Sequence, residues 1–286
     1  MITARRTGNT MGAEVSGVDL SRAMDDPAFW TILDLFLEHK VLVFRGQKVT
    51  APQFLAWANR FGRPEPHVLD QFHHPQYPDI LVLSNVVENG KPLGLADGGT
   101  YWHSDYSYLE IPARATTLYS IQVPERGGDT LFADQAAAYD DLPDAMKQRI
   151  DGLVGLHHYG NRDDMDPQSR TKAYPPDERQ KAERGITYLQ HPLVRRHPLT
   201  GRRMLYAVSG TSFGIVGMPQ EEALALLREL AAHSTQPKYQ FSVHYGVGDV
   251  VIWDNAAVLH SATLTDPDDP RTLWRITIKE KERPTA

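Results

Sequence analysis

The sequence predicts a mainly β protein with flanking helices, arranged as a double-sheet jelly roll. From residue 80 onward most apolar runs have the length of short strands, and only two segments there show a helical pattern. The 20 prolines and 21 glycines are spread along all 286 residues, as a turn-rich β scaffold requires. An alternating parallel sheet would need many more helices. Because no stretch has the composition of a linker, we expect one domain over residues 1–286.

Two helices are expected on either side of the first buried strand. Asp26 followed by Pro27 can cap a helix with apolar residues at helical spacing, namely Phe29, Trp30, Leu33, Phe36 and Leu37. Residues 41–44, Val-Leu-Val-Phe, have the pattern of a buried strand. Thr50 and Gln53 form a capping-box pattern for a second helix, which Gly62 ends. We expect these helices to pack against the sheet.

The rest of the chain is expected to be mostly strands. Apolar and β-branched runs predict them at 80–83, 116–122, 204–208, 250–253 and 273–278. Helices are expected around 143–150 and 219–233, where strong helix formers gather. A polar, proline-containing stretch at about 160–186 is expected to form a helical insert or lid loop.

Composition excludes several classes of site and partner. The chain has no cysteine, so a disulfide framework, a thiolate zinc site and a cysteine nucleophile are excluded, and a metal would need His, Asp or Glu ligands. A net charge of −6 without a Lys/Arg block argues against binding to nucleic acid or acidic membranes. No apolar run approaches the roughly 20 residues that span a bilayer. We expect a soluble, cytoplasmic protein that forms a homo-oligomer, either a dimer or a tetramer.

Three residues carry the pattern of a metal centre. His103 and Asp105 are two positions apart, so in an extended segment both side chains point to one face. With 12 histidines in the chain, about one His-x-Asp pair arises by chance, and the pair alone is weak evidence. His260 follows the apolar strand at 250–253 and a turn, where a third ligand could lie. A buried, hydrogen-bonded structural histidine is the alternative reading of His260.

Two arginines downstream could bind a carboxylate. On a strand, Arg271 and Arg275 share one face while Trp274 and Ile276 share the other. Arginine can grip a carboxylate through two parallel hydrogen bonds, although two arginines on an edge strand can also be plain surface charges. Two histidines and one carboxylate on one face of a metal leave positions open, as in iron(II) oxygenases.

Ordered motifs extend this pattern over nearly the whole chain. They are residues 41–47 (Val-Leu-Val-Phe-Arg-Gly-Gln), 61–64 (Phe-Gly-Arg-Pro), 102–105 (Trp-His-Ser-Asp), 127–130 (Gly-Gly-Asp-Thr), 191–194 (His-Pro-Leu-Val) and 253–255 (Trp-Asp-Asn), then His260, Arg271 and Arg275. In this order and spacing the chain resembles the taurine dioxygenase and 2,4-dichlorophenoxyacetate dioxygenase family of iron(II)- and 2-oxoglutarate-dependent enzymes.

The resemblance implies a double-stranded β-helix (jelly roll, cupin-like) and a role for each motif residue. His103, Asp105 and His260 would be the iron(II) ligands. Thr130 and Arg271 would bind the far carboxylate of 2-oxoglutarate, and Arg275 would meet an anionic group of the substrate or cosubstrate. His67 matches a position that contacts the acidic group of the substrate in the taurine enzymes. Further candidates for contact with the substrate are Tyr101, Arg162 and Thr211.

The reaction that the resemblance implies is hydroxylation of a small anionic organic substrate with O₂, with release of succinate and CO₂. Cleavage of a C–O or C–S bond can follow the hydroxylation. Residues 97–101 read Asp-Gly-Gly-Thr-Tyr and lack the asparagines of the taurine branch, which disfavours taurine. Related halogenases lack the carboxylate that Asp105 supplies, so chlorination is disfavoured. A sulfonate, a sulfate ester, a phenoxy acid or another carboxylate all stay open.

Two other functions compete with this reading. Residues 210–214, Gly-Thr-Ser-Phe-Gly, match the nucleophile elbow of serine esterases, with Ser212 followed by Asp249 or Asp254 and then His260. That elbow needs a helix directly after the serine, whereas Gly214, Gly217 and Pro219 intervene before any helical pattern. A non-catalytic jelly-roll protein could use the same three metal ligands, but it has no evident need for Thr130 and Arg271.

Overall fold

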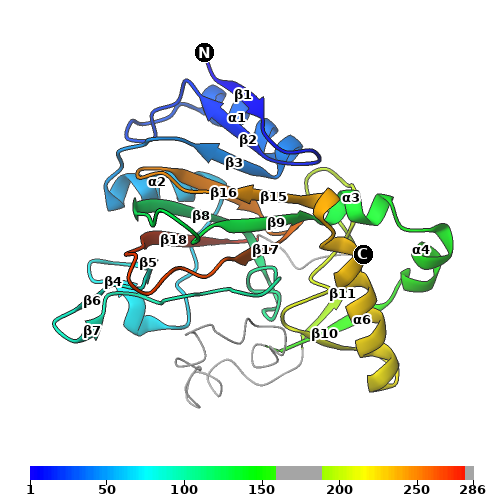
Figure 1. Cartoon of the computed structure of the whole chain (residues 1–286). Coiled ribbons are helices and arrows are strands. Elements are labelled where there is room, and N and C mark those ends of the chain that lie inside the picture. The colour runs from blue at the N-terminus through cyan, green and yellow to red at the C-terminus, as the bar shows by residue number, and fades with distance from the viewer. Residues whose placement is uncertain (159–188, 281–286) are drawn as a thin grey trace.

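The computed structural model describes residues 1–158 and 189–280, and its main element is an eight-stranded sheet (Figure 1). All neighbouring strands in this sheet are antiparallel except the pair β2 and β3. The strands follow one another in the order β1 (Thr3–Arg6), β2 (Ala13–Ser16), β3 (Val41–Phe44), β16 (Val250–Asp254), β8 (Ala113–Gln122), β18 (Thr272–Lys279), β5 (Tyr77–Ser84) and β4 (His73–His74).

A second, three-stranded sheet shares a core with the large one. It consists of β15 (Gln240–Val243), β9 (Thr130–Asp134) and β17 (Val258–Ala262). Phe132 of β9 and Trp253 of β16 meet across this core, with ring centroids 5.4 Å apart. Leu118, Val251 and Leu273 of the large sheet belong to the same buried cluster as Val243 and Val258 of the small one. Two sheets around one core form the double-sheet jelly roll that the sequence predicts.

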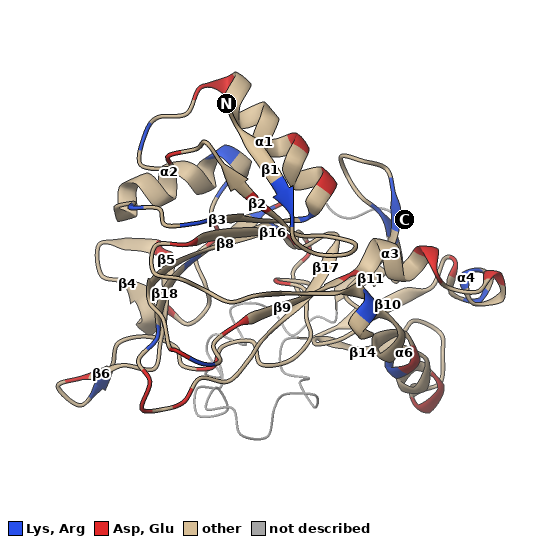
Figure 2. Cartoon of the chain, turned by 45° about the horizontal axis from the view of Figure 1, so that its top comes forward, with Lys and Arg blue, Asp and Glu red and all other residues tan. Residues whose placement is uncertain are grey.

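Two helices cover the other face of the large sheet. They are α1 (Asp26–His39) and α2 (Ala51–Phe61), and Figure 2 shows both lying on the same side of β3 and β16. Their aromatic residues pack with Leu42, Phe44 and Ile252 in a second buried cluster. The cap of α1 is Asp25, whose side chain accepts from the backbone N–H of Ala28, so the helix begins one residue earlier than expected.

The remaining described elements form a third layer beside the small sheet. Leu226 and Leu230 of this layer belong to one buried cluster with Leu259 of the small sheet. The elements are α3 (Gln135–Asp140), α4 (Asp144–Ile150), α6 (Gln220–Ser234), β10 (Val154–His157), β11 (Leu189–Pro192), β14 (Ser212–Ile215), β12 (Val194–Arg196) and β13 (Arg203–Leu205). Shorter elements elsewhere are β6 (Val87–Glu88), β7 (Lys91–Pro92), and the 3₁₀ turns η1 (Asp70–Phe72) and η3 (Pro237–Tyr239).

Most expected elements lie where the sequence predicts them. The strand expected at 204–208 is the exception, because β13 ends at Leu205 and Ala207 adopts a left-handed conformation with φ of 44°. The insert or lid expected at about 160–186 lies outside the described residues. Within the described part, no helix is long and apolar enough to cross a membrane.

A buried ion pair joins the helical layer to the small sheet. Lys40, which ends α1 with φ of 62°, donates from Nζ to Asp134 Oδ2 at 2.9 Å. The two side chains are only 7% and 1% exposed, and Asp134 also caps α3 through the backbone N–H groups of Ala136 and Ala137. Removal of one partner would therefore leave a buried charge without compensation.

We expect Lys40→Met to lower the free energy of unfolding by about 3 to 5 kcal/mol, the usual cost of breaking a buried pair from one side. Urea denaturation measures this change. Lys238→Met is the matched control, because Lys238 pairs with Asp141 in an exposed ion pair and its loss should leave stability nearly unchanged. Equal effects of the two substitutions would contradict a special role of the buried pair.

Candidate active site

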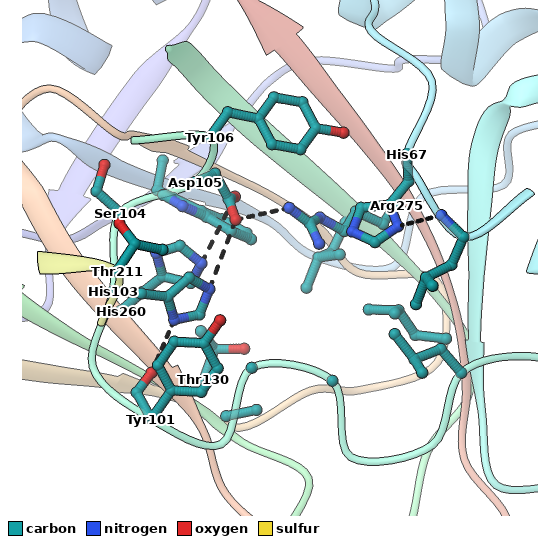
Figure 3. A pocket seen from close by; sticks show the side chains of 18 of the residues that line it. His67, Tyr101, His103, Ser104, Asp105, Tyr106, Thr130, Thr211, His260 and Arg275 are labelled. Carbon is teal, nitrogen blue, oxygen red and sulfur yellow. Dashed lines mark hydrogen bonds and ion pairs between the residues drawn. The ribbon is translucent and has the colours of Figure 1, made fainter. Parts of the chain in front are cut away.

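A pocket between the two sheets collects most of the residues that the sequence singles out (Figure 3). His103 and Asp105 lie in the segment that precedes β8, and His260 lies on β17. Thr130 begins β9, Arg271 immediately precedes β18, and Arg275 lies in the middle of β18. All of them line the pocket, so one cavity gathers side chains from residue 103 to residue 275.

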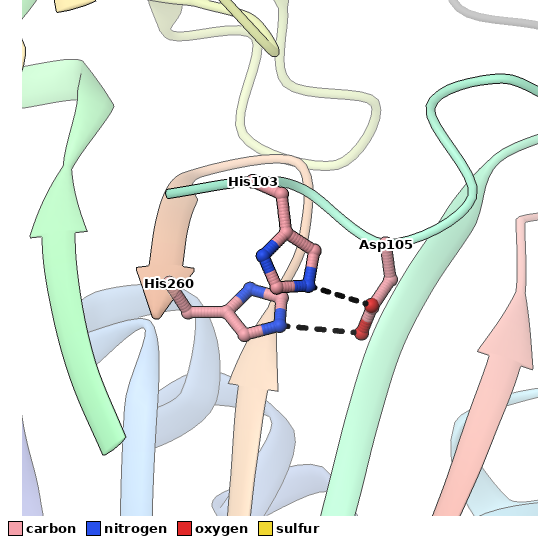
Figure 4. A group of neighbouring side chains, drawn as sticks. All are labelled: His103, Asp105 and His260. Atoms are coloured by element: carbon pink, nitrogen blue, oxygen red, sulfur yellow. Dashed lines mark ion pairs between the residues drawn. The ribbon is translucent and has the colours of Figure 1, made fainter. Parts of the chain in front are cut away.

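His103, Asp105 and His260 form a cluster of three possible metal ligands (Figure 4). One ligand atom from each lies within 4.8 Å of the others. Asp105 Oδ1 is 3.5 Å from His103 Nε2, and Asp105 Oδ2 is 3.6 Å from His260 Nε2. The two histidines also exchange backbone hydrogen bonds of 2.8 and 3.0 Å, which fix their segments side by side. Asp105 lies in a turn and not in the extended segment that its spacing suggests.

The protonation states of the cluster fit a divalent metal. His103 Nδ1 donates to the carbonyl oxygen of Tyr101 at 2.7 Å, so its Nε2 keeps a free lone pair when the ring is neutral. Burial, together with nearby His103, lowers the pKa of His260 well below its ordinary value, so the His260 ring is neutral. Burial alone would raise the pKa of Asp105, but Arg275 and the two histidines outweigh it and hold that pKa well below the usual range. The donor set is therefore two imidazoles and one carboxylate.

Arg271 is a buried cation that lacks a counterion within the described chain. Its side chain forms no ion pair with a described carboxylate, although Asp97 and Asp129 lie near enough to act on it electrostatically. Gly128, at φ of 66°, makes room for it, because a Cβ there would come within 2.8 Å of the arginine Cδ. A buried guanidinium without a carboxylate is costly, so this site suits an anion that the described residues do not supply.

Thr130 lies beside this arginine and is held by a residue that sequence reasoning missed. Its Oγ1 is 2.7 Å from the hydroxyl of Tyr245, and burial raises the pKa of that tyrosine to about 12. Two neutral hydroxyls and a guanidinium together suit a carboxylate. Tyr245 follows β15, which pairs with β9 at Thr130, and no motif spacing in the sequence indicates that contact.

Arg275 lies closer to the metal cluster than Arg271 does. Its Nη2 is 2.6 Å from Asp105 Oδ1, and its side chain is 14% exposed. Because β18 pairs with both β8 and β5, the two arginines are not on an edge strand, and the alternative of plain surface charges is wrong. Ile276, on the other side of the strand as expected, is buried under the helical layer.

The structure places four of the five candidate substrate residues at the pocket, and Arg275 is one of them. His67, Tyr101 and Thr211 line it, whereas Arg162 lies outside the described residues. The ring of Tyr101 stacks on His103 with centroids 4.5 Å apart. Four leucines that the sequence does not single out form an apolar wall of the pocket: Leu69, Leu83, Leu95 and Leu118. Tyr106 and Tyr108 also line the pocket, near Arg275.

The serine-esterase alternative is wrong. Ser212 belongs to β14, and α6 begins only at Gln220, so no helix follows the serine directly. His260 belongs to the metal cluster, and Asp254 instead binds His197 Nε2 at 2.7 Å. His157 Nδ1 does lie 3.2 Å from Ser212 Oγ, but burial lowers the pKa of this histidine to about 3, too low for a general base near neutral pH.

Comparisons with known proteins agree with this geometry. Residues 3–277 match the family model described as "Taurine catabolism dioxygenase TauD, TfdA family". The chain is 34% identical to an alpha-ketoglutarate-dependent 2,4-dichlorophenoxyacetate dioxygenase of Cupriavidus pinatubonensis, over 93% of each chain. It is 31% identical to a pentalenolactone F synthase of Streptomyces arenae, over 94% of this chain and 92% of that one. The solved structure of AAD-2 with Mn(II) and N-oxalylglycine superposes with a TM-score of 0.81 at 29% identity, covering 99% of both chains.

Proposed function

The chain belongs to the TauD, TfdA family of 2-oxoglutarate-dependent dioxygenases, and we propose that it hydroxylates a small anionic organic molecule at an iron(II) centre held by His103, Asp105 and His260. The observation that carries the proposal is the cluster of two imidazoles and one carboxylate, in the same pocket as the buried guanidinium of Arg271, which forms no ion pair with a described carboxylate. When bound, iron(II) and 2-oxoglutarate supply an oxidant made from O₂, with succinate and CO₂ as the other products.

Different residues of the pocket would bind the cosubstrate and the substrate. Arg271 and Thr130, with Tyr245 behind the threonine, would bind the far carboxylate of 2-oxoglutarate. Arg275, near the ligand cluster and in the same pocket as His67 (Figure 3), would bind the acidic group of the substrate. The pocket is sunk between the sheets, which limits water near the reacting groups.

We propose a substrate with an anionic head and an apolar body. The four leucines named above supply an apolar wall, and among the described residues that line the pocket Asp105 is the sole carboxylate. Among these described residues an ammonium group would therefore lack a carboxylate partner once Asp105 binds metal, which argues against taurine. The 2,4-dichlorophenoxyacetate named for one relative has the chemistry that this pocket favours.

The test is succinate formation with iron(II), ascorbate and 2-oxoglutarate across a panel of aryloxy acids, alkyl sulfates, sulfonates and taurine. We expect stimulation by at least one apolar-bodied acid, none by taurine, and loss of activity with an iron chelator. Slow succinate release without substrate would already separate an enzyme from a non-catalytic metal-binding protein. No succinate above the level of the Asp105→Ala variant with any compound would refute the proposal. A cytoplasmic location and a homo-oligomer, dimer or tetramer, stay predictions from the sequence.

A further inference from the structure

Asn255 has an amide whose orientation is fixed by its neighbours. Its Oδ1 lies 3.1 Å from the indole Nε1 of Trp253 and 3.3 Å from the backbone nitrogen of Asp105, and both of these groups can only donate. The atom that faces them must therefore be the amide oxygen. The other side of the amide, Nδ2, then donates to Thr116 Oγ1 at 2.9 Å.

This orientation also fixes the hydroxyl hydrogen of Thr116. A hydroxyl has one hydrogen, and Thr116 Oγ1 already accepts from Asn255. Its second close neighbour is Asp105 Oδ2, at 2.5 Å, and this carboxyl oxygen accepts from the hydroxyl. The hydrogen of Thr116 therefore points at Asp105. Both Thr116 and Asn255 are almost fully buried, so water does not compete for these bonds.

The two oxygens of Asp105 are thus held from two sides. Thr116 binds Oδ2, while Arg275 Nη2 lies 2.6 Å from Oδ1. Asn255 also joins the two segments that carry the cluster, because its backbone oxygen accepts from Ser104 Oγ at 2.8 Å. The carboxylate plane is consequently fixed toward both imidazoles without any help from a metal.

We infer that Thr116 and Asn255 are positioning residues that orient the Asp105 carboxylate for metal binding. The inference rests on the proposed function, in which Asp105 is a metal ligand. Loss of the Thr116 hydroxyl should let the Asp105 carboxylate turn toward Arg275 in the metal-free protein. Metal binding would then have to turn this carboxylate back. The cost should appear in metal affinity and not in the fold.

The experiment compares Mn(II) binding to the full chain, measured from the free Mn(II) signal in electron paramagnetic resonance, with the melting temperature of the metal-free protein. We expect Thr116→Val to raise the Mn(II) dissociation constant about 10-fold, as loss of a partner behind a metal ligand commonly does. Thr116→Ser keeps the hydroxyl and should restore affinity close to that of the unchanged protein. Thr116→Ala is a second variant without the hydroxyl, useful if the valine variant does not fold, and it should show the same weakening.

Thr117→Val is the matched control. Thr117 is the next residue of β8, equally buried, but its Oγ1 donates to the backbone oxygen of Val251 at 2.9 Å and faces the indole of Trp57, away from the pocket. We expect its melting temperature to fall about as much as that of Thr116→Val, with unchanged Mn(II) affinity. Unchanged affinity in Thr116→Val, or an equal loss in Thr117→Val, would overturn the inference.

The Asp105→Ala variant distinguishes failure of the metal site from failure of the positioning role of Thr116. If Asp105→Ala loses Mn(II) binding while Thr116→Val does not weaken it, the metal site stands and the positioning role fails. If Asp105→Ala binds Mn(II) as well as the unchanged protein does, the metal site itself is refuted, and the positioning role with it.

Discussion

Replacement of His260 by alanine should abolish 2-oxoglutarate-dependent turnover and leave the fold intact. The substitution removes one of three metal ligands, and the remaining pair, His103 and Asp105, comes from a single short segment. The backbone hydrogen bonds between residues 103 and 260 do not involve the side chain, so the two segments should stay paired. The cavity left beside Trp253, whose ring centroid is 4.7 Å from that of His260, should cost some stability but not folding.

Succinate formation, Mn(II) binding and the far-ultraviolet circular dichroism spectrum together test this prediction. His233→Ala is the control, because this histidine on α6 donates from Nε2 to the backbone oxygen of Ala138 at 2.8 Å and lies outside the pocket. It should retain both activity and metal binding. Iron-dependent turnover in the His260 variant would show that this histidine is not a required metal ligand. Unfolding of the variant would contradict the expectation that the site can be lost without loss of the fold.

The fold was predictable where a local pattern is long or strongly apolar. The buried strand at 41–44 and the strands at 250–253 and 273–278 are runs whose burial shows directly in composition. Strands such as β15 and β9 escaped prediction because they are short and mix polar with apolar residues, and their stability comes from pairing with each other. A pairing between residues 130 and 243 leaves no trace in either segment alone.

The residues of the candidate site were likewise predictable only in part. His103, Asp105 and His260 were found because their residue types and order resemble a metal-ligand motif. The spacing of Arg271 and Arg275 on one strand indicated a carboxylate site, and the resemblance then supplied Thr130. Tyr245 carries no such motif, and the apolar wall is made of leucines that look like any other core residues. The contact of Asn255 with Asp105 likewise depends on how a turn after β16 meets the segment before β8, which only the three-dimensional structure shows.

Arg271→Ala should raise the 2-oxoglutarate concentration needed for half-maximal rate by about 10-fold or more, since a charge-assisted bidentate contact contributes about 1.5 to 3 kcal/mol. The effect should fall mainly on KM, because the arginine would bind a carboxylate remote from the reacting atoms in both the ground state and the transition state. Arg271→Lys should be intermediate, as it keeps the charge but loses the paired donors. The KM for 2-oxoglutarate of the unchanged protein and of both variants is obtained from initial rates of succinate formation at increasing 2-oxoglutarate concentration.

Arg202→Ala is the control for loss of an arginine, because Arg202 forms an exposed ion pair with Asp140 and lies outside the pocket. It should leave KM for 2-oxoglutarate unchanged. The metal-free Arg271 variant should be at least as stable as the unchanged chain, since the buried guanidinium has no described counterion and its removal relieves the cost of burial. An unchanged KM together with lower stability would mean that Arg271 supports the fold and that another residue binds the far carboxylate.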